Sequence, residues 1–243
     1  SGAVLARVVR TNTSLTSIDF RRNPIDDNAL WLIGGLLLED DCQCKIGSLC
    51  TYAFEVEESA TSLKMRDNEM AVGAARCLIG VIKFNRKITS VDLSGCGIAV
   101  NAAQSLSKAL AYNRTITTLD LSRNPVSEVA NYRESELEFR KSAFHQFASS
   151  VGASDSLKTL TFVGSALPLP HIKGSGELSR VSRMLDLSNQ NLNPLSGIII
   201  GALVSQHHTL TEISLHNNVS LGPEGTRAIV DKLCVSTMRT LDL

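Results

Sequence analysis

A short pattern of apolar residues recurs along the chain at a fixed interval, and this repeat restricts the fold more than any other sequence feature. Each copy has a residue, usually apolar, at its first, fourth and sixth positions, and most often asparagine at its ninth. Copies begin at positions 15, 60, 88, 116, 157, 182, 210 and 238. Four of the seven intervals between these starts are 28 residues long, which indicates a structural repeat.

The segments between the copies have the pattern of helices. Residues 71–84, 101–110, 194–204 and 226–233 carry apolar side chains at helical spacing. Pro223 suits the first turn of such a helix. Each unit is therefore predicted to be a strand, a turn and a helix. One unit cannot bury its apolar stripe alone, so the units are expected to stack around one continuous core.

The 28-residue unit, the run Leu119-Asp120-Leu121-Ser122-Arg123-Asn124 and the turn at 221–225 resemble ribonuclease-inhibitor-type leucine-rich repeats. The resemblance covers about residues 3–243. It implies an α/β solenoid in the shape of a horseshoe, with a parallel β-sheet on the concave face, α-helices on the convex face and a right-handed βα superhelix. It does not specify a function, because inhibitors, sensors, GTPase activators and cytoskeletal scaffolds share this fold.

On this basis we expect one domain over 3–243, with about seven repeats and a truncated eighth. Residues 1–2 are interpreted as the remnant of an expression tag. Residues 3–10 have the pattern of the end of a repeat helix, and the chain ends within a strand phrase. Neither end has the polar cap that repeat arrays need for solubility. We therefore expect a piece of a longer protein, or ends that pair with another chain.

Three intervals differ from 28 residues and predict insertions near 39–59, 127–140 and 164–180. In the first, Ile46-x-x-Leu49 begins another strand phrase, which predicts an added strand or hairpin. It resembles an insertion in some ribonuclease-inhibitor-type repeat proteins of single-celled eukaryotes. In the second, residues 134–147 predict a longer amphipathic helix. In the third, two prolines and two glycines within 167–176 predict an extended loop and no helix.

Composition excludes several functions. The 24 basic and 24 acidic side chains give zero net charge, which argues against nucleic-acid binding. No apolar run approaches the roughly 20 residues that a membrane span needs. The 43% of hydrophobic residues rules out a mostly disordered chain. The family resemblance implies a cytoplasmic location, with the cytoskeleton or the cilium as narrower alternatives.

The cysteines do not form a recognisable metal or disulfide pattern. Cys42, Cys44 and Cys50 are the only cluster, and a fourth zinc ligand is missing. Cys77 and Cys96 are expected to be small buried hydrophobic residues. Free thiols, as in an intracellular protein, fit this spacing best.

No residue pattern indicates catalysis. The sequence contains neither a His-Glu-x-x-His motif nor a histidine beside a nucleophile. His207 and His208 are expected to end a helix and to favour its negative pole. We therefore predict a protein that is not an enzyme and has no catalytic residues, cofactor or metal.

The recurring asparagines are predicted to be structural. Asn23, Asn68, Asn124 and Asn218 occupy the ninth position of their copies. In the resemblance, this side chain lies inside the turn and satisfies backbone groups that the strand-to-helix bend leaves unpaired.

Side chains between the apolar strand positions are expected to point out of the concave face. Five of the eight residues at the fifth position of the pattern are aspartate. They are either ordinary solvated residues or an acidic central stripe with basic residues at its N-terminal end. A stripe of this kind would favour a protein partner with a basic patch. The partner-binding candidates are Asp19, Arg21, Lys64, Arg66, Asp92, Asp120, Asp186, Glu212 and His216.

These observations predict a non-enzymatic protein-protein interaction scaffold. Contacts would come from the concave row, the insertion at 42–58 and the loop at 168–176. One alternative is the repeat domain of a Ran-type GTPase activator, although the acidic tail expected after its repeats is absent here. Another is the ligand-sensing region of an immune-type nucleotide-binding receptor, whose nucleotide-binding domain is also absent here. The partner and the oligomeric state remain open.

Overall fold

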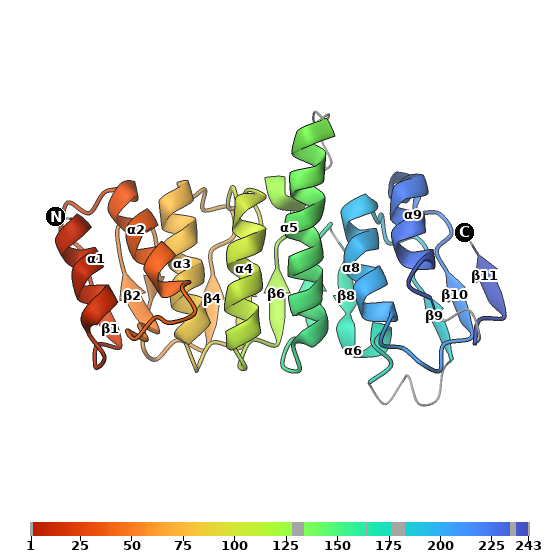
Figure 1. Ribbon diagram of the computed structural model, residues 1–243, viewed down its shortest axis with the longest axis horizontal. Coiled ribbons are helices and arrows are strands. Elements are labelled where there is room, and N and C mark those ends of the chain that lie inside the picture. Colours follow the sequence, from red (N-terminus) through yellow and green to blue (C-terminus); the bar gives the residue numbers. More distant parts are fainter. Residues whose placement is uncertain (1, 128–133, 164, 176–182, 234–236, 243) are drawn as a thin grey trace.

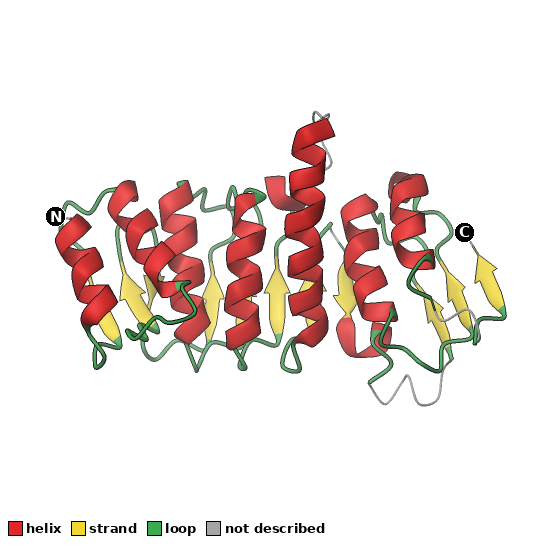
Figure 2. Ribbon diagram, in the orientation of Figure 1, coloured by secondary structure: helices red, strands yellow, loops and turns green. Residues whose placement is uncertain are grey.

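The computed structural model describes residues 2–127, 134–163, 165–175, 183–233 and 237–242. Helices and strands alternate along the chain, so the fold is α/β. The helices stand side by side in one row, and the strands form a second row behind them (Figure 1, Figure 2). The two ends of the chain lie at opposite ends of the array. Order in the sequence is therefore also order in space.

Most strands are three residues long and coincide with the apolar phrases of the repeat. They are β1 (Ser17–Asp19), β2 (Ser48–Cys50), β3 (Glu55–Val56), β4 (Ser62–Lys64), β5 (Ser90–Asp92), β6 (Thr118–Asp120), β7 (Thr159–Thr161), β8 (Ala166–Pro168), β9 (Met184–Asp186), β10 (Glu212–Ser214) and β11 (Thr240–Asp242).

The helices fill the segments between these phrases. They are α1 (Gly2–Thr11), α2 (Asp27–Leu37), α3 (Val72–Phe84), α4 (Asn101–Tyr112), α5 (Glu134–Ala153), α6 (Leu169–Ile172), α8 (Pro194–Val204) and α9 (Gly222–Val230), with short 3-10 turns at Pro125–Ser127 and Val219–Leu221. Pro194 and Pro223 both lie in the first turn of their helices, as Pro223 was predicted to do. A proline is tolerated there because its missing N–H would have no partner within the helix.

The expectation of one parallel sheet is wrong. The described strands form three sheets, which contain β1 to β3, β4 to β8 and β9 to β11. Successive repeats pair in parallel within each sheet, but β3 runs antiparallel to β2 and β8 runs antiparallel to β7. Each of these two strands occupies the edge where the strand of the next repeat would pair. Parallel pairing therefore stops at both places.

The segments expected to be insertions account for these breaks. Within 39–59, β2 pairs in parallel with β1, and β3 turns back to pair with β2. The helix α5 begins at Glu134, within 127–140, and is 20 residues long, and Phe144 and Phe147 are buried on it. The side chain of Leu137, expected on the same face, lies outside the described residues.

The prediction that 167–176 contains no helix is wrong. The segment holds β8 and the one-turn helix α6, with Pro170 in the first turn of that helix. Two prolines do not prevent a single turn, because only residues deeper in a helix need the missing N–H.

One apolar core runs between the two layers. Most of the apolar strand residues are buried, and in strands such as β4 the residues on either side face away from the helices, as Ser62 and Lys64 do beside the buried Leu63. Phe162 after β7 packs edge-on against Phe144 of α5, with ring centroids 5.4 Å apart. This alternation places every second strand residue on the open face of the sheets.

The ninth-position asparagine has its predicted role in two repeats. Asn124 is fully buried and makes five hydrogen bonds to backbone groups. Its partners are the N–H groups of Cys96 and Ile98 and the carbonyls of Leu93, Leu121 and Ser122. Asn218 makes the corresponding five contacts, with backbone groups of its own repeat and of the preceding one. Each asparagine therefore fastens one turn to the turn before it.

The same prediction is wrong for Asn23 and Asn68, which are both exposed. Asn23 bonds only the carbonyl of Arg21, and Asn68 bonds the carbonyl of Ala53 in the hairpin turn. A buried ladder position requires a regular repeat on its N-terminal side. Asn23 belongs to the first strand, and the β2–β3 hairpin stands in place of that repeat before Asn68.

A second asparagine position, three residues before the phrase, was missed in the sequence. Asn85 accepts hydrogen bonds from the N–H groups of Lys87 and Ile88, and Asn113 accepts them from Thr115 and Ile116. Asn113 also donates to the carbonyl of Asn85 at 2.9 Å. These residues close the turn from helix to strand and link successive repeats.

His207 occupies the same position in its repeat and does not end a helix as predicted. The helix α8 ends at Val204, and His207 is buried behind it. Gly174 lies against its ring, and neither ring nitrogen has a hydrogen-bond partner among the described residues. Burial lowers the pKa of His207, with smaller contributions from His171 and His208. The ring therefore favours its neutral form and does not complement a helix pole.

The backbones of α2 and α3 approach each other closely. A Cβ at Gly34 would overlap the backbone of Cys77, so only glycine permits this approach. Asp27 at the start of α2 accepts hydrogen bonds from the N–H groups of Gly73 and Ala74, at 2.9 and 2.8 Å. The residue before α3, Ala71, has no side chain that can cap the helix. One repeat thus caps the helix of the next.

Candidate functional site

The predicted binding residues lie on the face of the sheets that points away from the helices. Asp19, Lys64, Arg66 and Asp186 are exposed, and the other described members of the row are mostly half-buried. Glu212 is half-buried on β10, two residues before the buried Ser214. The alternation of buried and outward side chains follows the predicted frame in β4 and β9, whereas Ser214, at a position expected to face outward, is buried.

The breaks between the sheets divide the predicted row. Lys64, Asp92 and Asp120 are register partners on three adjacent strands of the central sheet, and Thr161 continues the row on β7. Neighbouring strands in a sheet lie roughly 4.8 Å apart, so these side chains are close neighbours. Asp19 belongs to the first sheet and Asp186 to the third. The acidic stripe is thus a set of separate groups, of which the central one is the most regular.

The aspartates have a structural role that the sequence interpretation missed. One carboxylate oxygen of Asp92 accepts hydrogen bonds from the N–H and hydroxyl of Ser94, at 3.0 and 2.6 Å. Asp120 makes the same pair of contacts with Ser122, at 2.9 and 2.7 Å. An Asp-x-Ser spacing directly after the strand is the signal that could have indicated it. Each carboxylate closes the turn after its strand and is held in one orientation.

Asp19 and Asp186 follow the same rule at the two ends of the array. Asp19 accepts a hydrogen bond from the N–H of Arg21 at 2.8 Å, and Asp186 accepts one from the N–H of Ser188 at 2.9 Å. In all four repeats the second residue after the aspartate is the donor, so the turn has the same form from the first sheet to the third.

Ion pairs neutralise part of the basic end of the row. Arg21 pairs with Asp19 at 2.7 Å and with Glu55 at 3.6 Å. Arg66 pairs with Asp92 of the next strand at 3.1 Å. Lys64 has no ion-pair partner in the described part of the chain. The central sheet therefore presents one unpaired cation at β4 and one unpaired carboxylate at Asp120.

Hydrogen bonds keep these carboxylates ionised. The hydrogen bond from the Arg21 side chain lowers the pKa of Asp19, and those from Ser188 lower the pKa of Asp186. Burial alone would raise the pKa of Asp92, but the hydrogen bonds from Ser94 and the charge of Arg66 outweigh it and lower the value. Asp19, Asp92 and Asp186 therefore keep their negative charges to a lower pH than free aspartates do.

Ser214, His216 and Asp242 form a polar cluster near the C-terminal end. Nδ1 of His216 lies 2.8 Å from the Ser214 hydroxyl and 3.1 Å from the Asp242 carboxylate, and the hydroxyl lies 3.0 Å from the same carboxylate. A Ser-His-Asp triad uses both ring nitrogens, one toward serine and one toward aspartate. Here a single nitrogen faces both, so the cluster lacks the geometry of a nucleophilic triad.

The hairpin in the first insertion exposes one aromatic side chain. The hydroxyl of Thr51 accepts hydrogen bonds from the N–H groups of Ala53 and Phe54 and closes a tight turn. Tyr52 stands at its tip and is 63% exposed. This places one bulky side chain of the predicted insertion in solvent.

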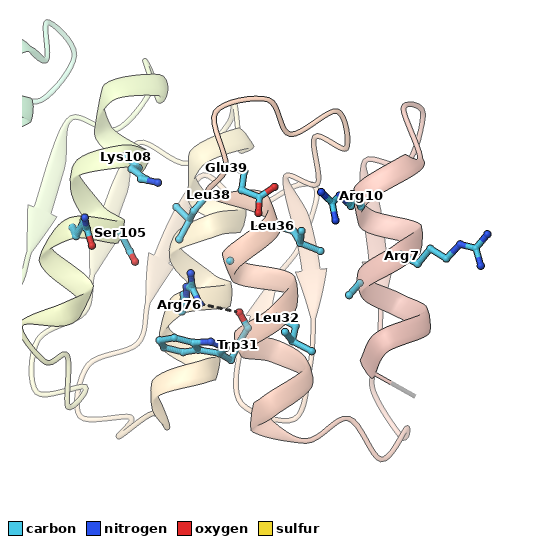
Figure 3. Close-up of a pocket in the computed structure, with 13 residues that line it drawn as sticks. Arg7, Arg10, Trp31, Leu32, Leu36, Leu38, Glu39, Arg76, Ser105 and Lys108 are labelled. Carbon is cyan, nitrogen blue, oxygen red and sulfur yellow. Dashed lines mark hydrogen bonds between the residues drawn. The ribbon is translucent and has the colours of Figure 1, made fainter.

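A second surface, which the sequence did not predict, lies on the helix side of the array. A groove of about 660 Å³ runs over α1 to α4 and is lined by side chains such as Trp31, Leu32, Arg76 and Lys108 (Figure 3). The sequence signal is weak but present. Trp31 and Leu32 are consecutive residues of an amphipathic helix, and 40% and 46% of their surfaces are exposed.

Five cysteines of the described part of the chain are free thiols: Cys42, Cys44, Cys50, Cys77 and Cys96. Cys234 lies outside the described residues. Within the described ranges, no three His, Cys, Asp or Glu side chains converge as a metal site would require. None of the described helices is long and apolar enough to cross a membrane.

Comparison with known families agrees with the geometry. A model of the leucine-rich repeat matches residues 11–30, 84–107 and 112–128. These matches support a leucine-rich repeat protein, and such repeats indicate a domain of the protein-interaction type. No curated protein gave a significant match to the chain.

Proposed function

We propose that the chain is a non-enzymatic scaffold that binds a protein partner on the open face of its central sheet, in an array of the ribonuclease-inhibitor type with horseshoe curvature. The observation that carries the proposal is the row Lys64, Asp92 and Asp120. Its members are in register on adjacent strands, and hydrogen bonds from serines fix its two carboxylates. Charges fixed before binding lose little conformational entropy in a complex.

The chemistry of this face defines the kind of partner. Asp120 has no cation paired with it in the described residues. Asp92 pairs with Arg66, whose side chain is largely exposed to solvent. Ser90, which is exposed on the same face, adds a hydroxyl group. A partner with a basic patch flanked by hydrogen-bonding groups complements this arrangement. The free thiols support a cytoplasmic setting, because disulfides are rare there.

The test is affinity capture from cell lysate with isosteric variants. In D92N/D120N, amide oxygens can still accept the hydrogen bonds from Ser94 and Ser122, so the turns are kept while two charges are removed. We expect proteins captured by the wild-type chain to be lost with this variant. D155N, which changes an exposed carboxylate outside the row, serves as the matched control and should capture the same proteins as wild type.

The identity of the captured proteins also separates the alternatives. A small GTPase, lost with D92N/D120N, would favour the repeat domain of a Ran-type activator. A pathogen-derived or other foreign ligand would favour the immune-type receptor. Identical captures by wild type, D92N/D120N and D155N would contradict binding through the sheet face.

A further inference from the structure

The groove on the helix side has an aromatic centre with a cation stacked on it. The guanidinium of Arg76 lies 4.1 Å from the centroid of the Trp31 ring and donates a hydrogen bond of 3.5 Å to the Trp31 carbonyl. A Cβ on Gly35 would stand 3.0 Å from the guanidinium carbon, so glycine leaves the room that Arg76 occupies. This cation–π pair keeps the guanidinium at the surface of the groove and leaves part of the tryptophan exposed.

The groove carries an excess of positive charge. Four cations line it, Arg7, Arg10, Arg76 and Lys108, whereas Glu39 is the only carboxylate among the described residues that line it. None of the four cations makes an ion pair with a carboxylate in the described part of the chain. Partial burial lowers the pKa of Arg76, so a bound anion would stabilise its charged form. This charge contrasts with the neutral chain as a whole.

The floor of the groove is apolar, and the cations are spread around it. Leu32 and Leu36 of α2 lie between α1 and the Trp31–Arg76 pair, and Lys108 reaches in from α4 (Figure 3). Arg10 points toward the groove from α1, whereas Arg7 points outward. A single phosphate would need donors that converge on one point. Cations distributed around an apolar floor suit an extended ligand that has both carboxylates and apolar side chains.

We propose that this groove binds an acidic protein segment with bulky apolar side chains, whose carboxylates contact Arg10, Arg76 and Lys108 and whose apolar side chains cover Trp31 and Leu32. Tryptophan and arginine are the residue types that most often dominate binding energy at interfaces. The site lies on the helix side, so its occupant need not compete with a partner on the sheet face. The chain would then join two proteins, one on each layer.

Trp31 is the only tryptophan in the chain, so its fluorescence reports on the groove directly. The probe is a tryptophan-free peptide of about 14 residues, roughly four helical turns, with glutamate and leucine or phenylalanine at helical spacing. A second probe alternates the same residues as an extended segment would. We expect one of the two to change the Trp31 emission in a saturable manner and to lose affinity as salt is added.

Variants locate the binding. R10Q/R76Q should weaken the peptide roughly tenfold in a fluorescence-anisotropy titration, and W31A should weaken it by a similar factor. The matched control is R86Q/R114Q, because Arg86 also lies over an aromatic ring, that of Tyr112, but outside the groove. The control should bind the peptide as the wild type does.

Four outcomes would overturn the proposal. The first is that neither peptide binds, and the second is that R86Q/R114Q weakens binding as much as R10Q/R76Q does. The third is equal binding of a peptide with serine in place of leucine and phenylalanine, which would indicate a simple anion site. The fourth is a shift of Trp31 emission by vesicles of phosphatidylserine and phosphatidylcholine but not by the peptides, which would indicate a membrane surface.

Discussion

Asn124 shows most clearly how a single side chain joins two repeats. It is buried and makes contacts with both its own turn and the preceding one, whereas Asn68 at the same sequence position is exposed with one long contact. The sequence pattern could not separate these two residues. The difference depends on whether a regular repeat precedes them, which is a property of the folded array.

This contrast gives a paired prediction. Asn124→Ala should lower the free energy of unfolding by about 1–3 kcal/mol, because it leaves buried backbone N–H and carbonyl groups without partners. Asn68→Ala should change it by less than about 0.5 kcal/mol, as expected for a surface site. Urea denaturation followed by circular dichroism measures both. Equal values for the two variants would contradict the assigned roles.

His207 predicts how stability depends on pH. Burial lowers its pKa in the folded chain from the ordinary value of 6.5, so the unfolded chain binds a proton at a higher pH than the folded chain does. The contribution of the neutral His207 ring to the free energy of unfolding is therefore fully present above about pH 6.5 and falls as the pH drops below that value. His171 on α6 and His208 beside it are the titratable neighbours that also disfavour the charged ring.

The test replaces His207 with asparagine, which is the residue at this position in other repeats. H207N should lose less stability than the wild type when unfolding at about pH 7.5 is compared with unfolding at about pH 5.5. H208N, which changes the exposed neighbour, should lose as much as the wild type. A variant H207N with the full acid sensitivity would show that another group is responsible.

Contacts between neighbouring elements explain which parts of the fold could be predicted. Helices 72–84, 101–112 and 194–204 appear close to where apolar spacing placed them, because each buries its own stripe. The sequence did not predict β8 and α6, since a three-residue strand outside the repeat phrase and a single helical turn have too few residues for a periodic signal. The antiparallel pairing that ends the central sheet involves β8.

The contact between α2 and α3 leads to a prediction at this scale. Asp27→Ala should lower the free energy of unfolding by about 0.5–2 kcal/mol, because it removes the only side chain that caps the N-terminus of α3. The matched control is Asn28→Ala at the exposed next position, which should have little effect. If both variants unfold at the same denaturant concentration, Asp27 is not the cap.

The whole molecule has two layers with different surfaces. The sheet layer presents carboxylates that the turns hold in place, and these residues could be predicted because they alternate with the apolar strand positions. The helix layer presents a groove with cations around Trp31. That groove was not predictable from any one repeat, because its residues come from four helices separated by up to about a hundred positions.

The central claim is that the sheet face binds a protein through Asp92 and Asp120. The most direct test is the affinity of a purified captured partner for three chains: wild type, D92N/D120N and R10Q/R76Q. Two buried or half-buried charges at an interface predict a loss of at least about tenfold for D92N/D120N, mostly in the dissociation rate. R10Q/R76Q, altered only on the helix side, should bind this partner as the wild type does. Equal affinity for wild type and D92N/D120N, or a loss confined to R10Q/R76Q, would contradict the claim.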